Sequence, residues 1–374
     1  MDRSEKILAS LNHIPIEVVC AQDYEWLAPN FIPKDKLAYI SGGSGHDVTL
    51  QRNVKVFSDF SITPRVLQDV SGGTTETTIL GQQFKHPIFL APLAYQSLAH
   101  SQAEIATAYA AESTDSCMVA STLSSVPLEQ IAECAGPERW FQLYFQHREE
   151  DTQDLIDRAI KAGFKAIVVT VDAAVQAPSM RAIRAGFQMS EEIVAANIVH
   201  QQPFAESKVK QGQNHIFGNY AQNAPSNEKL QELIKQSPVP VIIKGVMHPD
   251  DATELKAMGA AGIIVSNHGG RTLDGAPASL SVLPSIRSAV GDKFPVFLDS
   301  GIRSGADIFK AIVLGADAVL IGRLQVYALS VAGALGVAHM IKLLREELEL
   351  TMAMAGCSNI DEIKKSELHK SRER

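Results

Sequence analysis

Short apolar runs recur along the chain from residue 86 onward, and each run ends in small or polar residues. There are eight: PIFLAP (87–92), CMVAST (117–122), WFQLY (140–144), AIVVTVD (166–172), PVIIKG (240–245), GIIVSNHG (262–269), PVFLDSG (295–301) and AVLIGR (318–323). Runs that are apolar throughout are typical of strands buried on both faces, as in a parallel sheet. The pattern therefore predicts eight buried parallel strands.

Helix-like segments lie between several of these runs. They include QAEIATAYAAES (102–113), DTQDLIDRAIKAG (151–163), PDDATELKAMGA (249–260) and GADIFKAIVLGA (305–316). Eight strands that alternate with helices predict an α/β fold, the (β/α)8 TIM barrel. A doubly wound sheet is the competing fold, but its GxGxxG turn is absent. The nearest string, GGSG (42–45), lacks a third glycine and a preceding strand.

Two segments fall outside this alternation, and we interpret 1–374 as one barrel domain that carries both. Residues 1–85 are mixed in character and form an N-terminal extension, which we expect to be helical. Residues 173–239 separate the fourth and fifth strands and include the polar stretch HQQPFAESKVKQGQNHIFGNYAQNAPSN (200–227). A connection this long is usually functional or disordered. We expect it to form a lid over the carboxyl ends of the strands.

Composition narrows the class of protein. The 374 residues are 45% hydrophobic and 20% charged, which is typical of a globular domain, and the net charge is −8. An acidic chain argues against binding to nucleic acid or to an anionic membrane surface. We find no signal peptide and no run of about 18 apolar residues, so we expect no membrane span. Four scattered cysteines without a CxxC pair predict reduced thiols and a cytoplasmic location.

The predicted strands end in polar residues, although the runs themselves are apolar. These residues are Ser121, Gln142, Tyr144, Thr170, Asp172, Lys244, Asn267, His268, Arg271, Asp299, Arg303 and Arg323. A lone polar residue at a strand end is usually structural. A ring of them is different, because active sites of (β/α)8 barrels lie at the carboxyl ends of the strands.

The string SNHGGR (266–271) is the most informative of these strand ends. An imidazole at His268 can act as a base near neutral pH. The guanidinium of Arg271 can bind a carboxylate through two hydrogen bonds. Asp172 is positioned to hold the imidazolium, and Lys244 supplies a fixed positive charge where negative charge develops.

The last two strand ends predict an anion site. DSGIRSG (299–305) and IGR (321–323) each place glycine beside arginine directly after a strand. The loops after strands seven and eight commonly bind phosphate in barrels, through backbone N–H groups and arginines. The alternative interpretation is two ordinary turns with solvated arginines.

Taken together, these strings resemble the FMN-dependent α-hydroxy-acid oxidases and dehydrogenases, which include glycolate oxidase and lactate oxidase. The resemblance covers about residues 35–363. Its matching strings, in the family's order, are YISGGSG (39–45), ITPRVLQDV (62–70), ILG (79–81), PIFLAPLA (87–94), WFQLY (140–144), TVD (170–172), IIKGV (242–246), SNHGGRTLD (266–274), PVFLDSGIRSGADIFKAIVLGADAVLIGR (295–323) and ELELTMAMAGC (347–357). The family fold is a (β/α)8 barrel.

The resemblance implies a set of residues that bind FMN. They are Ala91, Pro92, Leu93, Ala94, Ser121, Gln142, Thr170, Lys244, Ser266, Asp299, Gly301, Arg303, Gly322 and Arg323. By the resemblance, the first seven contact the isoalloxazine ring, and Lys244 lies near flavin N1 and O2. The last five hold the ribityl chain and the phosphate. No metal is implied.

The resemblance also implies the residues that act on the substrate. His268 is the base, Asp172 is its partner, and Lys244 completes the catalytic group. The positions that bind the substrate carboxylate and hydroxyl, or shape the pocket for its side chain, are Tyr39, Tyr144, Arg271, Leu123 and Ala94. Leu123 resembles the residue found at this position in family members that act on lactate or longer aliphatic acids.

The chain departs from the family pattern after TVD (170–172). The family carries an arginine seven residues past the aspartate, beside the substrate, and this chain has Ser179 there. Arg181 lies two residues further on. One hypothesis is that Arg181 reaches the pocket and substitutes for the missing arginine. The alternative is that the site is rebuilt for a larger substrate.

These observations predict an FMN-dependent oxidase of L-2-hydroxy acids, with lactate favoured, that forms the 2-oxo acid and reduces O2 to H2O2. A dehydrogenase with another acceptor, a monooxygenase, and a flavin-binding barrel weakened by Ser179 are the alternatives. The residues do not distinguish hydride transfer from a carbanion route. By resemblance we expect a homotetramer. From the composition we expect no nucleic-acid or membrane partner.

Overall fold

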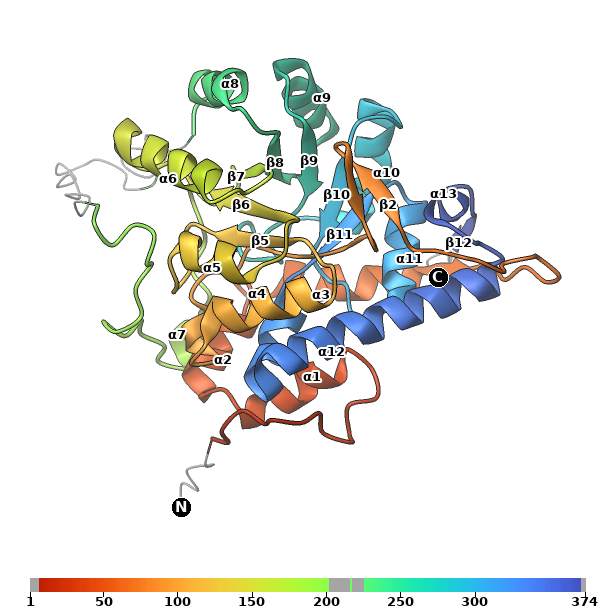
Figure 1. The fold of residues 1–374 in the computed structure, drawn as a ribbon, viewed down its shortest axis with the longest axis horizontal. Coiled ribbons are helices and arrows are strands. Elements are labelled where there is room, and N and C mark those ends of the chain that lie inside the picture. The colour runs from red at the N-terminus through yellow and green to blue at the C-terminus, as the bar shows by residue number, and fades with distance from the viewer. Residues whose placement is uncertain (1–6, 202–215, 217–224, 371–374) are drawn as a thin grey trace.

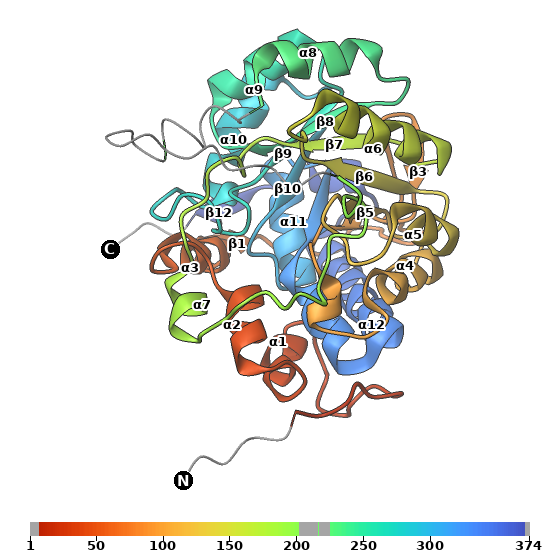
Figure 2. The same ribbon diagram turned by 90° about the vertical axis from the view of Figure 1, so that its left-hand side faces the viewer.

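Eight parallel strands close into a barrel in the computed structural model, which describes residues 7–201, 216 and 225–370 (Figures 1 and 2). The strands are β4 (Ile88–Leu90), β5 (Met118–Ser121), β6 (Arg139–Leu143), β7 (Ile167–Thr170), β8 (Val241–Val246), β9 (Gly262–Val265), β10 (Val296–Asp299) and β11 (Ala318–Ile321). Neighbours pair in sequence order, and β11 pairs with β4 to close the ring. Each strand coincides with one of the eight apolar runs, and only β6 and β8 extend one residue beyond theirs, so the predicted barrel is confirmed.

Alternation along the strands builds two hydrophobic cores. Side chains that point inward fill the barrel, and three of them, Phe89, Trp140 and Phe297, pack edge to face or tilted with ring centroids 5.1–5.9 Å apart. A hairpin of β2 (Thr77–Ile79) and β3 (Gln82–Phe84) adds Phe84 to this core, 4.7 Å from Phe89. Side chains that point outward pack against the surrounding helices. The barrel interior is therefore solid, and a site can form only at its mouth.

Helices cover the outside of the barrel. They are α4 (Ala103–Ser113), α5 (Leu128–Cys134), α6 (Glu149–Lys161), α8 (Asn227–Gln236), α9 (Pro249–Met258), α10 (Ser279–Val290), α11 (Gly305–Val313), α12 (Arg323–Ala355) and α13 (Ile360–Ile363). The four helices predicted from sequence appear as α4, α6, α9 and α11. Two of these helices, α6 and α8, combine polar residues with a buried apolar stripe; α6 buries Leu155 and Ile156.

The connection after β7 differs in part from the expected lid. A short helix, α7 (Met180–Arg184), follows the strand, and the last part of the segment forms α8, which buries Leu230 and Leu233 against the barrel. Our expectation that all of 173–239 forms a lid is wrong at its carboxyl end. The apolar pair three residues apart, among polar neighbours, makes that end an amphipathic helix. Residues 202–215 and 217–224, where the polar stretch lies, fall outside the described residues.

The N-terminal extension contains several short helices, as expected, but more than half of its described residues are not helical. Its helices are α1 (Asp23–Leu27), α2 (Lys34–Ser41) and α3 (Val48–Lys55), with the 3-10 turns η1 (Ala28–Asn30) and η2 (Val56–Asp59); a third, η3 (Gln96–Leu98), follows β4. The extension also holds the hairpin described above and β1 (Phe60–Ile62), which pairs with β12 (Leu368–Lys370). Both views place α1 beside α12 and α7 beside α2 (Figures 1 and 2). The extension therefore contacts both α12 and the segment after β7.

In the described part of the chain, α12 is long and apolar enough to cross a membrane by length and composition. However, 78% of its most apolar window is buried inside the protein, as in a core helix. Non-helical backbone at Ala332 and Gly333 also interrupts the helix near its middle.

Candidate active site at the mouth of the barrel

A cavity opens at the carboxyl ends of the strands. The proposed site residues that line it are Tyr39, Ala91, Pro92, Leu93, Ala94, Ser121, Leu123, Gln142, Tyr144, Thr170, Lys244, His268, Arg271, Asp299, Gly301, Arg303, Gly322 and Arg323. Asp172 and Ser266 do not line the cavity; they lie behind it, in contact with His268 and Lys244. The structure therefore brings together the residues that the sequence places on separate strands.

The cavity also includes residues that sequence reasoning missed. They are Ile40, Gln96, Gln176, Gly269, Ser300, Ile302, Leu320 and Val326, together with Tyr95. Tyr95 directly follows Ala94, a predicted site residue, and this position is the signal that could have identified it. Gln176 comes from the connection after β7, and nothing in its local sequence marks it.

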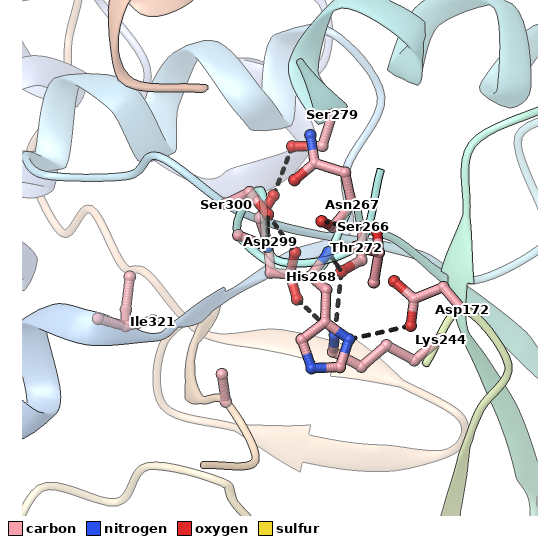
Figure 3. A network of polar contacts seen from close by, with 12 residues as sticks. Asp172, Lys244, Ser266, Asn267, His268, Thr272, Ser279, Asp299, Ser300 and Ile321 are labelled. Atoms are coloured by element: carbon pink, nitrogen blue, oxygen red, sulfur yellow. Dashed lines mark hydrogen bonds and ion pairs between the residues drawn. The ribbon is translucent and has the colours of Figure 1, made fainter. Parts of the chain in front are cut away.

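His268 and Asp172 form the central polar pair. The Nδ1 atom of His268 lies 3.0 Å from Oδ1 of Asp172 (Figure 3). This contact fixes the imidazole and leaves Nε2 as the nitrogen available to a ligand. Burial raises the pKa of Asp172, but the nearby His268 and Lys244 outweigh it, so the net pKa lies below its ordinary value. Asp172 is therefore an ionised partner for an imidazolium.

Gly245 makes room for Asp172. Its φ is +106°, a conformation that L side chains rarely adopt, and a Cβ added there would lie 2.6 Å from both Cβ and Cγ of Asp172. Gly245 lies on β8, directly after Lys244. A glycine on one strand thus lets the carboxylate that follows the neighbouring strand pack against the backbone.

Lys244 supplies a buried positive charge beside this pair. Its Nζ donates to Oγ of Ser266 at 2.9 Å and lies 3.1 Å from Oδ2 of Asp299 (Figure 3). Burial lowers the pKa of Lys244, but attraction to Asp299 and Asp172 outweighs burial, so the pKa is raised. Lys244 therefore stays protonated at the floor of the cavity, where it can stabilise an anion.

Arg271, Tyr39 and Tyr144 form another part of the cavity wall. The Nη1 group of Arg271 donates to the carbonyl oxygens of Tyr39 at 2.7 Å and Gly42 at 3.0 Å. Its Nε and Nη2 atoms have no hydrogen-bond partner within residues 7–201, 216 and 225–370, so they can bind a carboxylate. Burial raises the pKa of Tyr144 to about 12, which keeps its hydroxyl protonated.

Glycines and arginines after β10 and β11 form the far end of the cavity. Gly322 precedes α12 without a side-chain cap, and open space surrounds the position of its missing Cβ. Arg303 lies in the same region and pairs with Glu25 of α1, with Nε 2.7 Å from Oε2. Arg323 donates to three backbone carbonyls, those of Ile40, Gly42 and Gly269. Burial and Arg271 lower its pKa to about 10.

These features fit FMN. The backbone at the start of α12 and the two arginines suit a phosphate, because helix N-termini and guanidinium groups bind anions. Toward the barrel axis, Gln142 has a buried Nε2 without a hydrogen-bond partner in the described residues, and its Oε1 accepts from Ser121. Such a group needs a ligand acceptor, and a flavin ring provides one. The described residues contain no cluster of three or more potential metal ligands.

Arg181 does not substitute for the missing arginine. Its guanidinium pairs with Asp47, with Nη2 2.7 Å from Oδ2, and donates to Ser41 at 3.2 Å, and Arg181 is absent from the cavity lining. Ser179 also lies outside the cavity, since its Oγ caps α7 by accepting from Ala182. The hypothesis fails because α7 packs against α2, so both side chains meet the N-terminal extension.

Comparison with known proteins gives consistent matches. Residues 28–370 match the model of a family described as FMN-dependent dehydrogenase. The chain is 52% identical over 352 residues to L-lactate oxidase from Alicycliphilus denitrificans, covering 94% of this chain and 96% of that protein. It is 37% identical to 2-hydroxyacid oxidase 1 from Homo sapiens, covering 95% and 97%. The structure is similar to mandelate oxidase with (S)-2-phenylpropionate, with a TM-score of 0.85, 36% identity, and coverage of 94% and 98%.

Proposed function

We infer the function of this chain from its family: it belongs to the FMN-dependent dehydrogenases, the family of the α-hydroxy-acid oxidases. It oxidises an L-2-hydroxy acid to the 2-oxo acid and reduces O2 to H2O2. L-lactate is the substrate we favour, because several similar proteins are named L-lactate oxidase. In this reaction L-lactate and O2 yield pyruvate and H2O2, so each substrate molecule loses two electrons and two protons.

The observation that carries this proposal is the placement of one base, one carboxylate clamp and one buried cation around a single cavity. Arg271 holds the substrate carboxylate through its free Nε and Nη2 groups, with the hydroxyls of Tyr39 and Tyr144 nearby. His268 removes a proton through Nε2, and Asp172 stabilises the imidazolium that results. Lys244 contributes the fixed positive charge on the cofactor side.

FMN, when bound, supplies the chemistry that accepts two electrons from the substrate and passes them to O2. Gln142, Ser121 and Lys244 would hold the ring, and Gly322 with Arg323 would hold the phosphate end. Arg303 would assist at the phosphate, next to Glu25. These residues line the same cavity as His268 and would bind and orient the cofactor there.

The side chain of the substrate would lie near Ala94, Tyr95 and Leu123, which line the same cavity. The small side chain of Ala94 and the larger side chains of Tyr95 and Leu123 suit a short aliphatic acid such as lactate. Gln176 adds a neutral polar group from the connection after β7. Neither Ser179 nor Arg181 lines the cavity. At the substrate end of the cavity, Arg271 is therefore the cation that recognises the carboxylate.

Oxygen consumption with a panel of acids tests this proposal. The FMN-loaded protein is mixed with L-lactate, D-lactate, glycolate and L-mandelate, and H2O2 is measured in parallel. We expect L-lactate to give the fastest oxygen uptake with one H2O2 per O2, and D-lactate to give none. His268→Ala is the matched control, which should keep FMN and lose activity. If flavin is reduced but O2 is not consumed, an artificial electron acceptor identifies the dehydrogenase alternative.

We further propose that the protein acts in the cytoplasm as a homotetramer. Cys20, Cys117, Cys134 and Cys357 are all free, which supports a reducing compartment. The tetramer rests on resemblance, and exposed apolar side chains such as Trp26 and Leu350 offer contact surface. Light scattering during gel filtration tests the assembly, and a monomeric mass would contradict it.

A further inference from the structure

A stacked pair of aromatic rings joins the connection after β7 to the cavity. Phe187, three residues past the end of α7, stacks on Tyr39 with ring centroids 4.4 Å apart and an interplanar angle of 14°. Arg271 also lies over the Tyr39 ring, with its Cζ 4.9 Å from the centroid. Tyr39 and Arg271 line the cavity, whereas Phe187 does not. Phe187 therefore contacts a substrate-binding side chain from outside the cavity.

The backbone around α7 holds Phe187 in this position. The N–H of Phe187 donates to the carbonyl of Ala182 at 3.1 Å, which closes the carboxyl end of α7. Gly186, with φ +72°, makes the reversal that brings the ring back toward α2. The stack thus depends on how α7 is attached.

The amino end of α7 is attached to the N-terminal extension. The N–H of Gly45 donates to the carbonyl of Pro178 at 2.9 Å, and Gly45 forms an isolated bridge with Ser179. Arg181 pairs with Asp47, whose other carboxylate oxygen accepts from the N–H of Gly43. The residues that replace the family's active-site arginine segment therefore dock α7 on the loop that follows α2.

We propose that Phe187 is a positioning residue that acts through Tyr39 to set the affinity of the site for the carboxylate of its ligand. This inference rests on the proposed function for the identity of the ligand class. The ring of Phe187 limits the rotation of Tyr39, and Arg271 limits it from the barrel side. Removal of the Phe187 ring frees Tyr39 and loosens the group that surrounds the carboxylate. The imidazole of the base, His268, is held by Asp172 and not by the Phe187–Tyr39 stack, so the rate of the chemical step should change little.

The test uses the FMN-loaded protein with Phe187→Leu and Phe187→Tyr, and with Ile183→Ala as a control on the exposed side of α7. Two quantities are measured: KM and kcat for L-lactate, and the Kd of pyruvate from the change in flavin absorbance. Loss of one aromatic stack should raise KM and Kd by roughly 3- to 10-fold. We expect kcat to stay within about 2-fold, and Phe187→Tyr and Ile183→Ala to behave like the wild type.

A double variant shows whether the effect passes through Tyr39. In a Tyr39→Leu background, which has no ring to position, Phe187→Leu should produce no further rise in Kd. An unchanged Kd in the single variant, or a full shift in the Tyr39→Leu background, would overturn the inference. Pyruvate binding needs no turnover. An enzyme that shows these Kd shifts without oxidising L-lactate therefore refutes the proposed function and supports the role of Phe187.

Discussion

Asp172→Asn removes one negative charge while keeping the shape of the side chain beside His268. The carboxylate is 12% exposed, its Oδ1 lies 3.0 Å from Nδ1 of His268, and its Oδ2 has no hydrogen-bond partner in the described residues. A hydrogen bond to a charged group is worth about 1.5–3 kcal/mol, and a buried charge left without its partner costs about 3–5 kcal/mol. Since an amide still accepts a hydrogen bond, we expect a loss of about 2–4 kcal/mol. That loss corresponds to about 30- to 1000-fold in rate.

Anaerobic rapid mixing with L-lactate measures this effect, because flavin bleaching reports the reductive step alone. The variant should bind FMN in full and bleach about 30- to 1000-fold more slowly at saturating substrate. Asp250→Asn is a matched control, because Oδ2 of Asp250 lies 3.7 Å from Nδ1 of His248 in an exposed pair. Neither residue has a proposed role in the reaction. A fully loaded Asp172→Asn protein that bleaches within about threefold of the wild-type rate would refute the assignment of Asp172.

Four further predictions address the same site. Arg271→Lys should raise KM for L-lactate about tenfold in steady-state assays, because a point charge cannot form the two parallel hydrogen bonds of a guanidinium. Gly245→Ala should slow anaerobic bleaching as Asp172→Asn does, since its Cβ would displace that carboxylate. The lowered pKa of Asp172 stabilises the folded protein above about pH 4, and this stabilisation is lost as pH falls further, so a profile of Tm against pH should show no loss from this group above pH 4. Ser179→Arg should not raise the bleaching rate, and it should lower Tm because it removes the cap of α7.

The barrel and the core of the site were predictable from sequence because both follow local rules. Buried parallel strands are apolar along their length, so their polar ends stand out, and closure of the barrel brings those ends together. His268, Lys244 and Arg271 were found in this way. Their proposed roles as base, cation and clamp rest on side-chain chemistry, to which the structure adds the distances.

Contacts between distant segments were not predictable. The Asp47 partner of Arg181 lies 134 residues away along the chain, and Glu25 lies 278 residues from Arg303. No periodicity records such pairs, because each depends on how the N-terminal extension packs on the barrel. The stack of Phe187 on Tyr39 is of the same kind.

The most direct test of the account mixes the FMN-loaded protein with L-lactate in the absence of oxygen and then admits O2. L-lactate should bleach the flavin, one pyruvate should form per flavin, and O2 should restore the colour with release of one H2O2. D-lactate should leave the flavin yellow. A flavin that stays oxidised with L-lactate and with the other L-2-hydroxy acids of the panel would contradict the central claim.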